Sequence, residues 1–410
     1  MNTHLKKGFH SICVKDPIID GLSAHVPPIY ATSTFTYENL DAAFDFFKNG
    51  GTNKDTFTYS RLGNPSVKFV ADKIASLEAY ALEDEEGKPL KAYGMLFASG
   101  MAAVTASIIA IVKSGDKIIT QGNLYGTTNE LLTTTLKDLG IETIYADLKD
   151  LSFVEEAILN DEKIKLLYIE TPANPTLECF DLNALAKIAK NRGIKTVVDN
   201  TFATPYIQQP LKYGIDFVVH SSTKFLNGHG TGTSGVLIGK DSNFMHTKVY
   251  GIQKMTGGIC SPFEAFLLNN GIKTLPLRMD QHQKNAMQLA LFLKNHPNVS
   301  KVNYLGLEDH PDYIISKGQM YGASGMISFE IKGGINAGMQ FMRAIQFCTL
   351  TASLGTADTL VTHPASTSHV NMRNEQRLKH GITEGLIRVS VGLENIEDII
   401  ADFRQALDSF

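Results

Sequence analysis

The stretch that decides the fold class spans residues 215–230, with the sequence I-D-F-V-V-H-S-S-T-K-F-L-N-G-H-G. Its apolar part, 217–219, predicts a buried strand, which is followed by hydroxyl side chains, Lys224 and a loop rich in Gly and His. The hydroxyl groups can bind an anion and the amine can form a Schiff base, and a phosphate-bearing aldehyde such as pyridoxal phosphate needs both. In isolation, S-x-x-K more often marks a strand-end lysine that points to water. The remaining motifs favour the cofactor.

A second apolar strand, within 194–202, ends in Asp199. A carboxylate at the end of a buried parallel strand is costly unless it has a partner, and a protonated pyridine nitrogen is a suitable one. Asp199 and Lys224 lie one strand–helix–strand step apart. We therefore expect them at opposite ends of one flat cofactor, at the carboxyl edge of a parallel sheet.

The run M-L-F-A-S-G-M-A-A (95–103) predicts a strand, a turn of small residues and a helix. The free N–H groups of Gly100 and Met101 at that helix start would form an anion site. A plain packing turn, or a turn that holds a nucleotide, fits the same pattern. Tyr125 follows the next strand, where it can stack on a planar ring or be an ordinary half-buried tyrosine.

Two further stretches carry candidate site residues. L-L-Y-I-E-T-P-A-N-P-T (166–176) predicts a strand that enters a loop with two prolines and Asn174. Arg388 lies among apolar neighbours in a predicted strand, where it suits either a substrate carboxylate or a structural salt bridge.

The N-terminal segment, 1–70, shows no clear globular pattern, so we expect an extended arm that contacts a neighbouring subunit. Tyr59 and Arg61 stand two residues apart in it and would point to one face, where they suit a phosphate. A surface Tyr/Arg pair is the alternative. We expect a cofactor-binding domain over 71–270 and a smaller C-terminal α/β domain over 271–410.

Composition narrows the class of protein. The 410 residues carry a formal net charge of -4, which suggests no nucleic-acid partner, and no apolar run is long enough for a membrane span. The four cysteines are scattered without metal-ligand spacing, so we expect a cytoplasmic enzyme and no metal. No G-x-G-x-x-G with a following acidic residue supports a nucleotide-dependent oxidoreductase.

Together, several motifs resemble the pyridoxal-phosphate-dependent enzymes of cysteine and methionine metabolism. The resemblance covers nearly the whole chain and rests on Y-S-R-L-G-N-P, A-S-G-M-A-A, Y-G-T-T, E-T-P-A-N-P-T, V-V-D-N-T-F, H-S-S-T-K-F-L-N-G-H, S-L-G-T-A-D-T-L-V-T-H-P-A-S and G-L-I-R-V-S-V-G-L-E. It implies the aspartate aminotransferase-like fold (fold type I), with a mixed, mostly parallel seven-stranded sheet, and a homotetramer built from two dimers that share active sites.

The resemblance also implies a role for each candidate residue. Lys224 would bind the cofactor aldehyde and act as base, Asp199 would pair with the ring nitrogen, and Tyr125 would stack on the ring and act as a general acid. The other implied contacts are Gly100, Met101, Ser221 and Thr223 with the phosphate, Tyr59 and Arg61 with the phosphate from the neighbouring subunit, Asn174 with the phenolic oxygen, and Ser353 and Arg388 with the substrate carboxylate.

Within the family, the runs around S-L-G and M-T-G-G-I-C-S-P are most similar to methionine γ-lyases, which release methanethiol, 2-oxobutyrate and ammonia. Members that act on cystathionine usually carry a glutamate where this chain has Ala352. Thr127 and the pair Gln253 and Lys254 depart from the methionine γ-lyase pattern, and H-G-T-G-T-S-G-V (229–236) is closer to the O-acetylhomoserine sulfhydrylases. A sulfhydrylase, a cystathionine γ-lyase or γ-synthase, and a catalytically silent binder of the cofactor therefore remain as alternatives.

Overall fold

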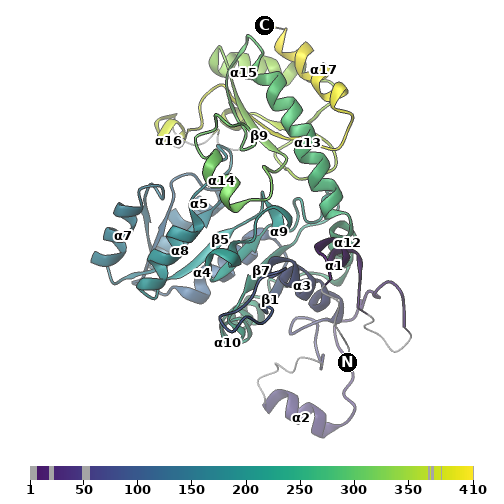
Figure 1. Cartoon of the computed structure of the whole chain (residues 1–410). Coiled ribbons are helices and arrows are strands. Elements are labelled where there is room, and N and C mark those ends of the chain that lie inside the picture. Colours follow the sequence, from purple (N-terminus) through teal and green to yellow (C-terminus); the bar gives the residue numbers. More distant parts are fainter. Residues whose placement is uncertain are drawn as a thin grey trace.

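The computed structural model describes residues 7–17, 23–48, 56–367, 370, 374–379 and 381–409. Two sheets organise this part of the chain, one of seven strands and one of five (Figure 1). The predicted mixed, mostly parallel seven-stranded sheet and the smaller C-terminal sheet are thereby confirmed. Division of the chain at residues 70 and 270 stays a prediction.

The seven-stranded sheet has the order β1-β7-β6-β5-β4-β2-β3, in which only β7 runs antiparallel to its neighbours. Its central strands, β4 to β7, are short, mostly apolar runs with few exposed residues, as expected for a sheet covered by helices, whereas the edge strand β3 is partly exposed. Their bounds are β1 Tyr93–Phe97, β2 Lys117–Thr120, β3 Glu142–Tyr145, β4 Ile164–Glu170, β5 Lys195–Asp199, β6 Phe217–His220 and β7 Gly235–Gly239.

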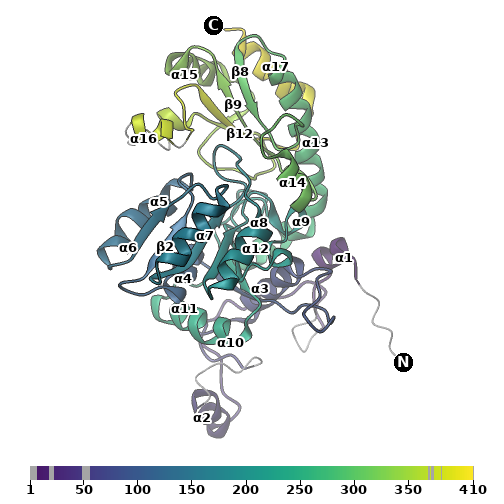
Figure 2. The ribbon, with the colours of Figure 1, turned by 60° about the vertical axis from the view of Figure 1, so that its left-hand side comes forward.

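Helices cover both faces of this sheet (Figure 2). Alternate side chains of the central strands enter two hydrophobic layers. One layer is formed with α4 Gly100–Ile111, α5 Gly126–Thr133, α6 Thr135–Asp138 and the π-helix η2 Met245–Val249. The opposite layer is formed with α3 Pro65–Glu78, α7 Leu151–Asn160, α8 Leu182–Asn191 and α12 Pro262–Lys273. Short helices α9 Thr204–Ile207, η1 Pro210–Tyr213, α10 Ser242–Phe244 and α11 Tyr250–Thr256 connect these elements.

The five-stranded sheet has the order β10-β11-β12-β9-β8 and packs its apolar face against three helices. The rings of Phe329, Phe341 and Phe403 meet in this core, with centroids 5.5–6.1 Å apart. Its strands are β8 Val299–Asn303, β9 Met326–Ile331, β10 Thr349–Leu350, β11 Leu360–Thr362 and β12 Leu386–Ser390. Its helices are α13 Leu275–Lys294, α15 Gly334–Ala344 and α17 Ile396–Leu407, with α14 Tyr313–Gln319, η3 Pro364–Ser366 and α16 Asn374–Lys379 in the connections.

The N-terminal segment is divided between a packed and a projecting part. Helix α1 Phe9–Val14 buries Phe9 and Cys13 against α3 and α12, whereas α2 Leu40–Lys48 stands away from the body of the molecule (Figure 1). On α2, Leu40, Phe44 and Phe47 are exposed. Within the described residues, no helix is long and apolar enough to cross a membrane.

Candidate active site

Lys224 lies in the turn that follows the buried strand β6, as predicted. Its amine donates a hydrogen bond of 3.0 Å to the hydroxyl of Ser353, which belongs to the C-terminal part of the chain. Burial and, to a lesser extent, the nearby charge of Arg388 together lower the pKa of Lys224 to about 8. A larger fraction of this amine is therefore neutral near pH 7 than of an ordinary lysine, which makes it a better nucleophile and base.

Two residues to which the sequence assigned no role, Arg278 and Gly355, hold the Lys224 turn in place. The guanidinium of Arg278 donates to the carbonyl oxygens of Phe225 and Leu226. Gly355 of the S-L-G run has φ +75° and lies so close that a Cβ atom would stand 2.5 Å from the amide nitrogen of Phe225. These contacts fix the backbone on which the amine stands.

Asp199 is at the carboxyl end of β5, beside Glu170 of β4 and Val219 of β6. Thr201 donates to one carboxylate oxygen of Asp199 from both its amide and its hydroxyl, with an N–O distance of 3.0 Å. Burial raises the pKa of Asp199, although these hydrogen bonds oppose the shift. A cation such as a protonated ring nitrogen would offset the cost of keeping this carboxylate charged.

The N-terminus of α4 approaches the turn after β6 at Gly100. A Cβ atom at Gly100 would come within 2.6 Å of the Cβ of Ser221, so only glycine permits this approach. Ser99 caps the helix by accepting from the amide of Ala102. In the described part of the chain, the amides of Gly100 and Met101 and the hydroxyl of Ser221 have no hydrogen-bond partner.

These unpaired donors form a cradle that fits a phosphate group. The hydroxyl of Thr223 is engaged elsewhere, because it donates to the carbonyl of Ser234 and accepts from the amide of the same residue. The predicted phosphate site is thus brought together at Gly100, Met101 and Ser221, with Thr223 ordering the turn beside them.

Arg388 crosses from β12 of the C-terminal sheet to the same site. It donates to the side chain of Asn174 at 3.1 Å and to the carbonyl oxygens of Ala352 and Ser353 at 2.9 and 3.0 Å. It is buried, and among the described residues it forms no ion pair. Burial lowers its pKa to about 10. A buried guanidinium without a carboxylate partner is costly, and a substrate carboxylate would supply one.

Tyr125 precedes α5 at the same edge of the sheet, with 46% of its surface exposed. Its amide donates at 2.8 Å to Glu170, a buried carboxyl that the sequence analysis did not single out. The side chain of Tyr125 is therefore open to a ligand while its backbone is anchored.

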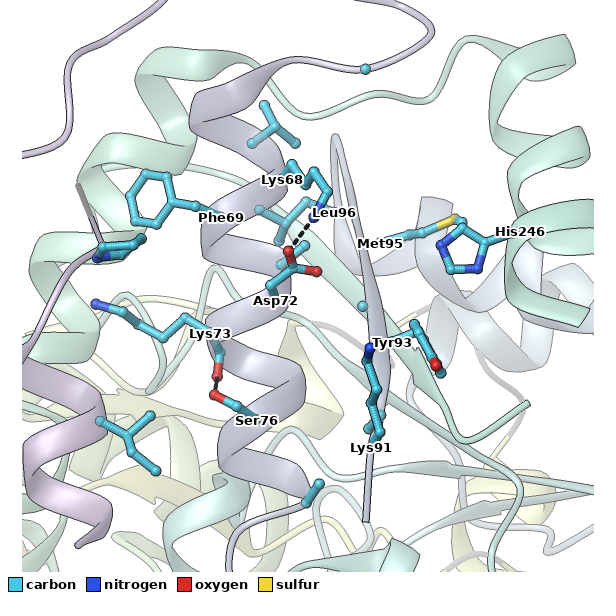
Figure 3. A pocket seen from close by; sticks show the side chains of 18 of the residues that line it. Lys68, Phe69, Asp72, Lys73, Ser76, Lys91, Tyr93, Met95, Leu96 and His246 are labelled. Carbon is cyan, nitrogen blue, oxygen red and sulfur yellow. Dashed lines mark hydrogen bonds and ion pairs between the residues drawn. The ribbon is translucent and has the colours of Figure 1, made fainter. Parts of the chain in front are cut away.

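Tyr59 and Arg61 are not joined to this site by any hydrogen bond or ion pair of the described residues. The Arg61 guanidinium instead stands 5.5 Å from the centre of the Tyr59 ring and donates to the carbonyl of Lys254 on α11. Near this segment, a cavity of about 1310 Å³ lies between α3, β1 and the N-terminal segment (Figure 3). None of the predicted cofactor or substrate residues lines this cavity.

The residues at the sheet edge fit pyridoxal phosphate. They offer an amine with a lowered pKa, a partly buried carboxyl at the end of β5, the strand next to β6, and a set of unpaired N–H and O–H donors for a phosphate. No group of three or more metal-ligating side chains occurs in the ranges that the structure describes. The fold and the residues at this edge of the sheet fit the class of α/β enzymes that use a phosphorylated aldehyde as cofactor.

Comparison with known proteins identifies the family. The model for Cys/Met metabolism PLP-dependent enzymes matches residues 13–408, and the chain belongs to this family. Pyridoxal 5'-phosphate is therefore its cofactor. The predicted family and fold type are confirmed.

Relatives of known activity align over most of the chain. L-methionine gamma-lyases from Fusobacterium nucleatum subsp. nucleatum and Pseudomonas putida are 43% and 41% identical, over 93% and 94% of this chain and 93% and 92% of theirs. A cystathionine gamma-lyase from Bacillus subtilis is 41% identical over 86% of this chain and 89% of its own. The crystal structure of cystathionine gamma-lyase from Lactobacillus plantarum has a TM-score of 0.88 at 36% identity and covers 98% of this chain and 99% of that one.

Proposed function

We propose that this protein is a methionine γ-lyase-like enzyme that splits a sulfur amino acid by γ-elimination. With methionine and water, the products would be methanethiol, 2-oxobutyrate and ammonia. Support comes above all from Arg388, a buried cation without an ionic partner in the described residues, whose neighbour Ser353 accepts from the Lys224 amine. This arrangement suits an amino acid whose carboxylate pairs with Arg388 while its α-carbon faces the lysine.

In this proposal each residue of the candidate site has a role. Arg388 and Ser353 bind the substrate carboxylate, and Asn174 keeps the guanidinium in place. The neutral amine of Lys224 removes the proton from the substrate α-carbon. The bound cofactor supplies an electron-withdrawing ring that stabilises the negative charge formed there.

Two further residues complete the proton transfers. Asp199 in its charged form holds the proton on the ring nitrogen, which keeps the ring electron-withdrawing. Removal of a proton from the substrate β-carbon then leaves the electron pair that expels the γ-sulfur, and the exposed hydroxyl of Tyr125 donates a proton to that departing sulfur. Gly100, Met101 and Ser221 hold the phosphate from one side, and Thr223 orders the turn beside them.

The experiment that tests this function is a product assay. The purified protein, loaded with pyridoxal phosphate, is mixed with methionine, with cystathionine, or with O-acetylhomoserine plus sulfide, and 2-oxobutyrate and homocysteine are measured. We expect 2-oxobutyrate from methionine at the highest kcat/KM. Homocysteine from O-acetylhomoserine with little 2-oxobutyrate would assign γ-replacement instead, and no turnover with any of them would identify a silent binder.

Cystathionine is expected to be the poorer substrate. Ala352, which stands before the S-L-G run, offers its carbonyl to Arg388 and carries no anion for the distal ammonium group of that substrate. Preference for cystathionine over methionine would overturn this part of the proposal.

We also propose a homotetramer, built as two dimers with shared active sites, in the cytoplasm. Exposed Leu40, Phe44 and Phe47 on the projecting helix α2 are apolar surface suited to a second copy of the chain. Because no hydrogen bond or ion pair of the described residues joins Tyr59 and Arg61 to their own Lys224 site, these side chains could complete the phosphate site of a neighbour. The arm over 1–70 would then be the shared element, with the cofactor domain over 71–270 and the C-terminal domain over 271–410.

Subunit mixing tests the shared site. Lys224→Ala and Arg61→Ala proteins would each have little activity, and dissociation followed by reassociation of the mixture would restore part of it. Mixtures that stay inactive, although mass measurement shows mixed oligomers, would place both residues in one subunit's site.

A further inference from the structure

Glu170 is a buried carboxyl at the carboxyl end of β4 that binds two separate loops. One of its oxygens accepts from the amide of Tyr125 at 2.8 Å, and the other accepts from the amide of Asn174 at 3.0 Å. Only 5% of Glu170 is exposed. The two loops that carry the proposed ring-stacking tyrosine and the asparagine partner of Arg388 therefore meet at one side chain.

The electrostatic surroundings of Glu170 disfavour a negative charge on its carboxyl group. In the described residues it forms no ion pair, and its neighbour across the sheet is another carboxyl, Asp199. Burial, with the charge of Asp199, raises the pKa of Glu170 to about 8, although the two amide hydrogen bonds oppose the shift. A buried carboxyl kept at such a cost, with both oxygens bound to backbone amides, indicates a task in the site rather than in general packing.

The strand end on which Glu170 stands is itself fixed. Gln121 accepts from the amide of Glu170 at 3.1 Å and donates to its carbonyl at 2.6 Å. From Asn174, contacts continue through Arg388 and Ser353 to the amine of Lys224. Glu170 thus stands at one end of a continuous series of hydrogen bonds that ends at the proposed base.

We propose that Glu170 is a positioning residue that sets both the ring-facing tyrosine and the substrate-carboxylate clamp, by tying the Tyr125 and Asn174 loops to the strand beside Asp199. It does so without touching substrate or cofactor. This inference rests on the proposed function and deepens it.

The variant Glu170→Gln tests the pair of hydrogen bonds. Glutamine has nearly the same size but one acceptor oxygen, and its NH₂ group would face one of the two backbone N–H donors. One loop would then be displaced. Glu170→Asp keeps the carboxyl group but is one methylene shorter, so it would reach one amide and not both.

Asp216→Asn is the matched control. Asp216 is a carboxyl on the same sheet at the opposite edge, where it accepts from the amide and hydroxyl of Thr196 and from Lys195. It also binds a neighbouring backbone amide, yet no proposed site residue depends on it. Thermal unfolding of all three variants reports the structural effect of losing such a group.

The site-specific readouts are the visible circular dichroism of the bound cofactor and the separate kcat and KM values for methionine. For Glu170→Gln we expect changed dichroism, a raised KM through Asn174 and Arg388, a lowered kcat through Tyr125, and about a 10- to 100-fold loss in kcat/KM. The dichroism and the kcat/KM of Glu170→Asp should lie between those of Glu170→Gln and those of the wild type. Asp216→Asn should keep the wild-type dichroism and kcat/KM even if its thermal stability is lowered.

A double-mutant cycle with Tyr125→Phe gives the sharper result. If Glu170 acts partly through Tyr125, Glu170→Gln costs less in the Tyr125→Phe background than in wild type. Equal losses in both backgrounds, together with unchanged dichroism, would overturn the inference. If Glu170→Gln does not fold, Glu170→Asp with wild-type dichroism and kcat/KM would also overturn it.

Failure of the proposed function has a different signature. Wild-type protein without turnover on any of the three substrates would refute the function, and this inference with it. Wild-type turnover that Glu170→Gln leaves unchanged would refute the role of Glu170 alone.

Discussion

Among the described residues, the candidate site groups at the carboxyl edge of the seven-stranded sheet lack the ion pairs that charged groups at its amino edge form. At the amino edge, Lys117 pairs with Asp161 and Glu142 at 2.9 and 3.2 Å, and Lys195 pairs with Asp216 at 3.1 Å. At the carboxyl edge, none of Glu170, Asp199 and Lys224 forms an ion pair in the described part of the chain.

This difference separates charges that stabilise the fold from charges kept for a ligand. The charged groups at the amino edge are partly exposed, so they lose little hydration on folding, and each ion pair adds a modest electrostatic attraction. The unpaired groups at the carboxyl edge are held at a cost in stability, which a bound ligand with a phosphate, a ring nitrogen and a carboxylate would offset.

The largest expected effect is that of Lys224→Ala. It removes both the covalent anchor and the proposed base, so kcat should fall by roughly 10⁴-fold or more. The visible band of lysine-bound cofactor should vanish in the absorbance spectrum. A persistent band in the variant would mean that another amine is the anchor.

Asp199→Ala comes next in size. Loss of the carboxylate should lower kcat on the order of 10²- to 10³-fold, because the ring nitrogen is no longer held in its charged form. Cofactor affinity, measured by titration of the apo-protein, should fall much less, since the phosphate contacts remain. Near-normal kcat in this variant would refute the electron-withdrawing role of the ring.

A smaller effect follows from the pKa of Lys224, which burial and the charge of Arg388 lower to about 8. The neutral amine captures the aldehyde, so the rate of cofactor uptake by apo-protein should rise with pH and level off above about 8. An ordinary lysine would level off above about 10.4. Arg388→Leu removes a cation, so the midpoint should move to higher pH, and uptake measured by stopped-flow absorbance at pH 7.5 should slow. A midpoint near 10 in the wild type would contradict this assignment.

The smallest effect on catalysis is expected at the amino edge. Asp216→Asn removes one ion pair and weakens two hydrogen bonds to Thr196, which should cost about 1 kcal/mol in the free energy of unfolding. Steady-state kinetics should match the wild type. A loss of kcat/KM comparable to that at the carboxyl edge would erase the contrast between the two edges.

Side chains with an unusual position in the sequence were predictable. Lys224 and Asp199 each follow a buried apolar run, and Arg388 interrupts one, so their cost of burial is visible in the residue pattern alone. The Gly100 turn was predictable because a strand, small residues and a helix follow one another. The strand and helix at each of these places are confirmed.

Residues that act on the backbone were not predictable. Glu170 binds two amides and Arg278 binds carbonyl oxygens, and every residue carries such groups, so no partner side chain marks them in the sequence. Helix α2 was also not expected, since residues 1–70 showed no clear globular pattern. The sharing of Tyr59 and Arg61 between subunits stays a prediction, because it depends on a second chain.

Ala352 combines a fixed main chain with a free side chain. Its carbonyl accepts a hydrogen bond from Arg388. Nearby, Gly355 leaves no room for a side chain next to Phe225. Ala352 itself is exposed. Substrate range can therefore drift during evolution by exchange of a single side chain here, while the geometry that performs the chemistry stays intact. Such a division between an invariant reaction centre and an adaptable rim gives a physical basis for the diversity of lyases and synthases built on one scaffold.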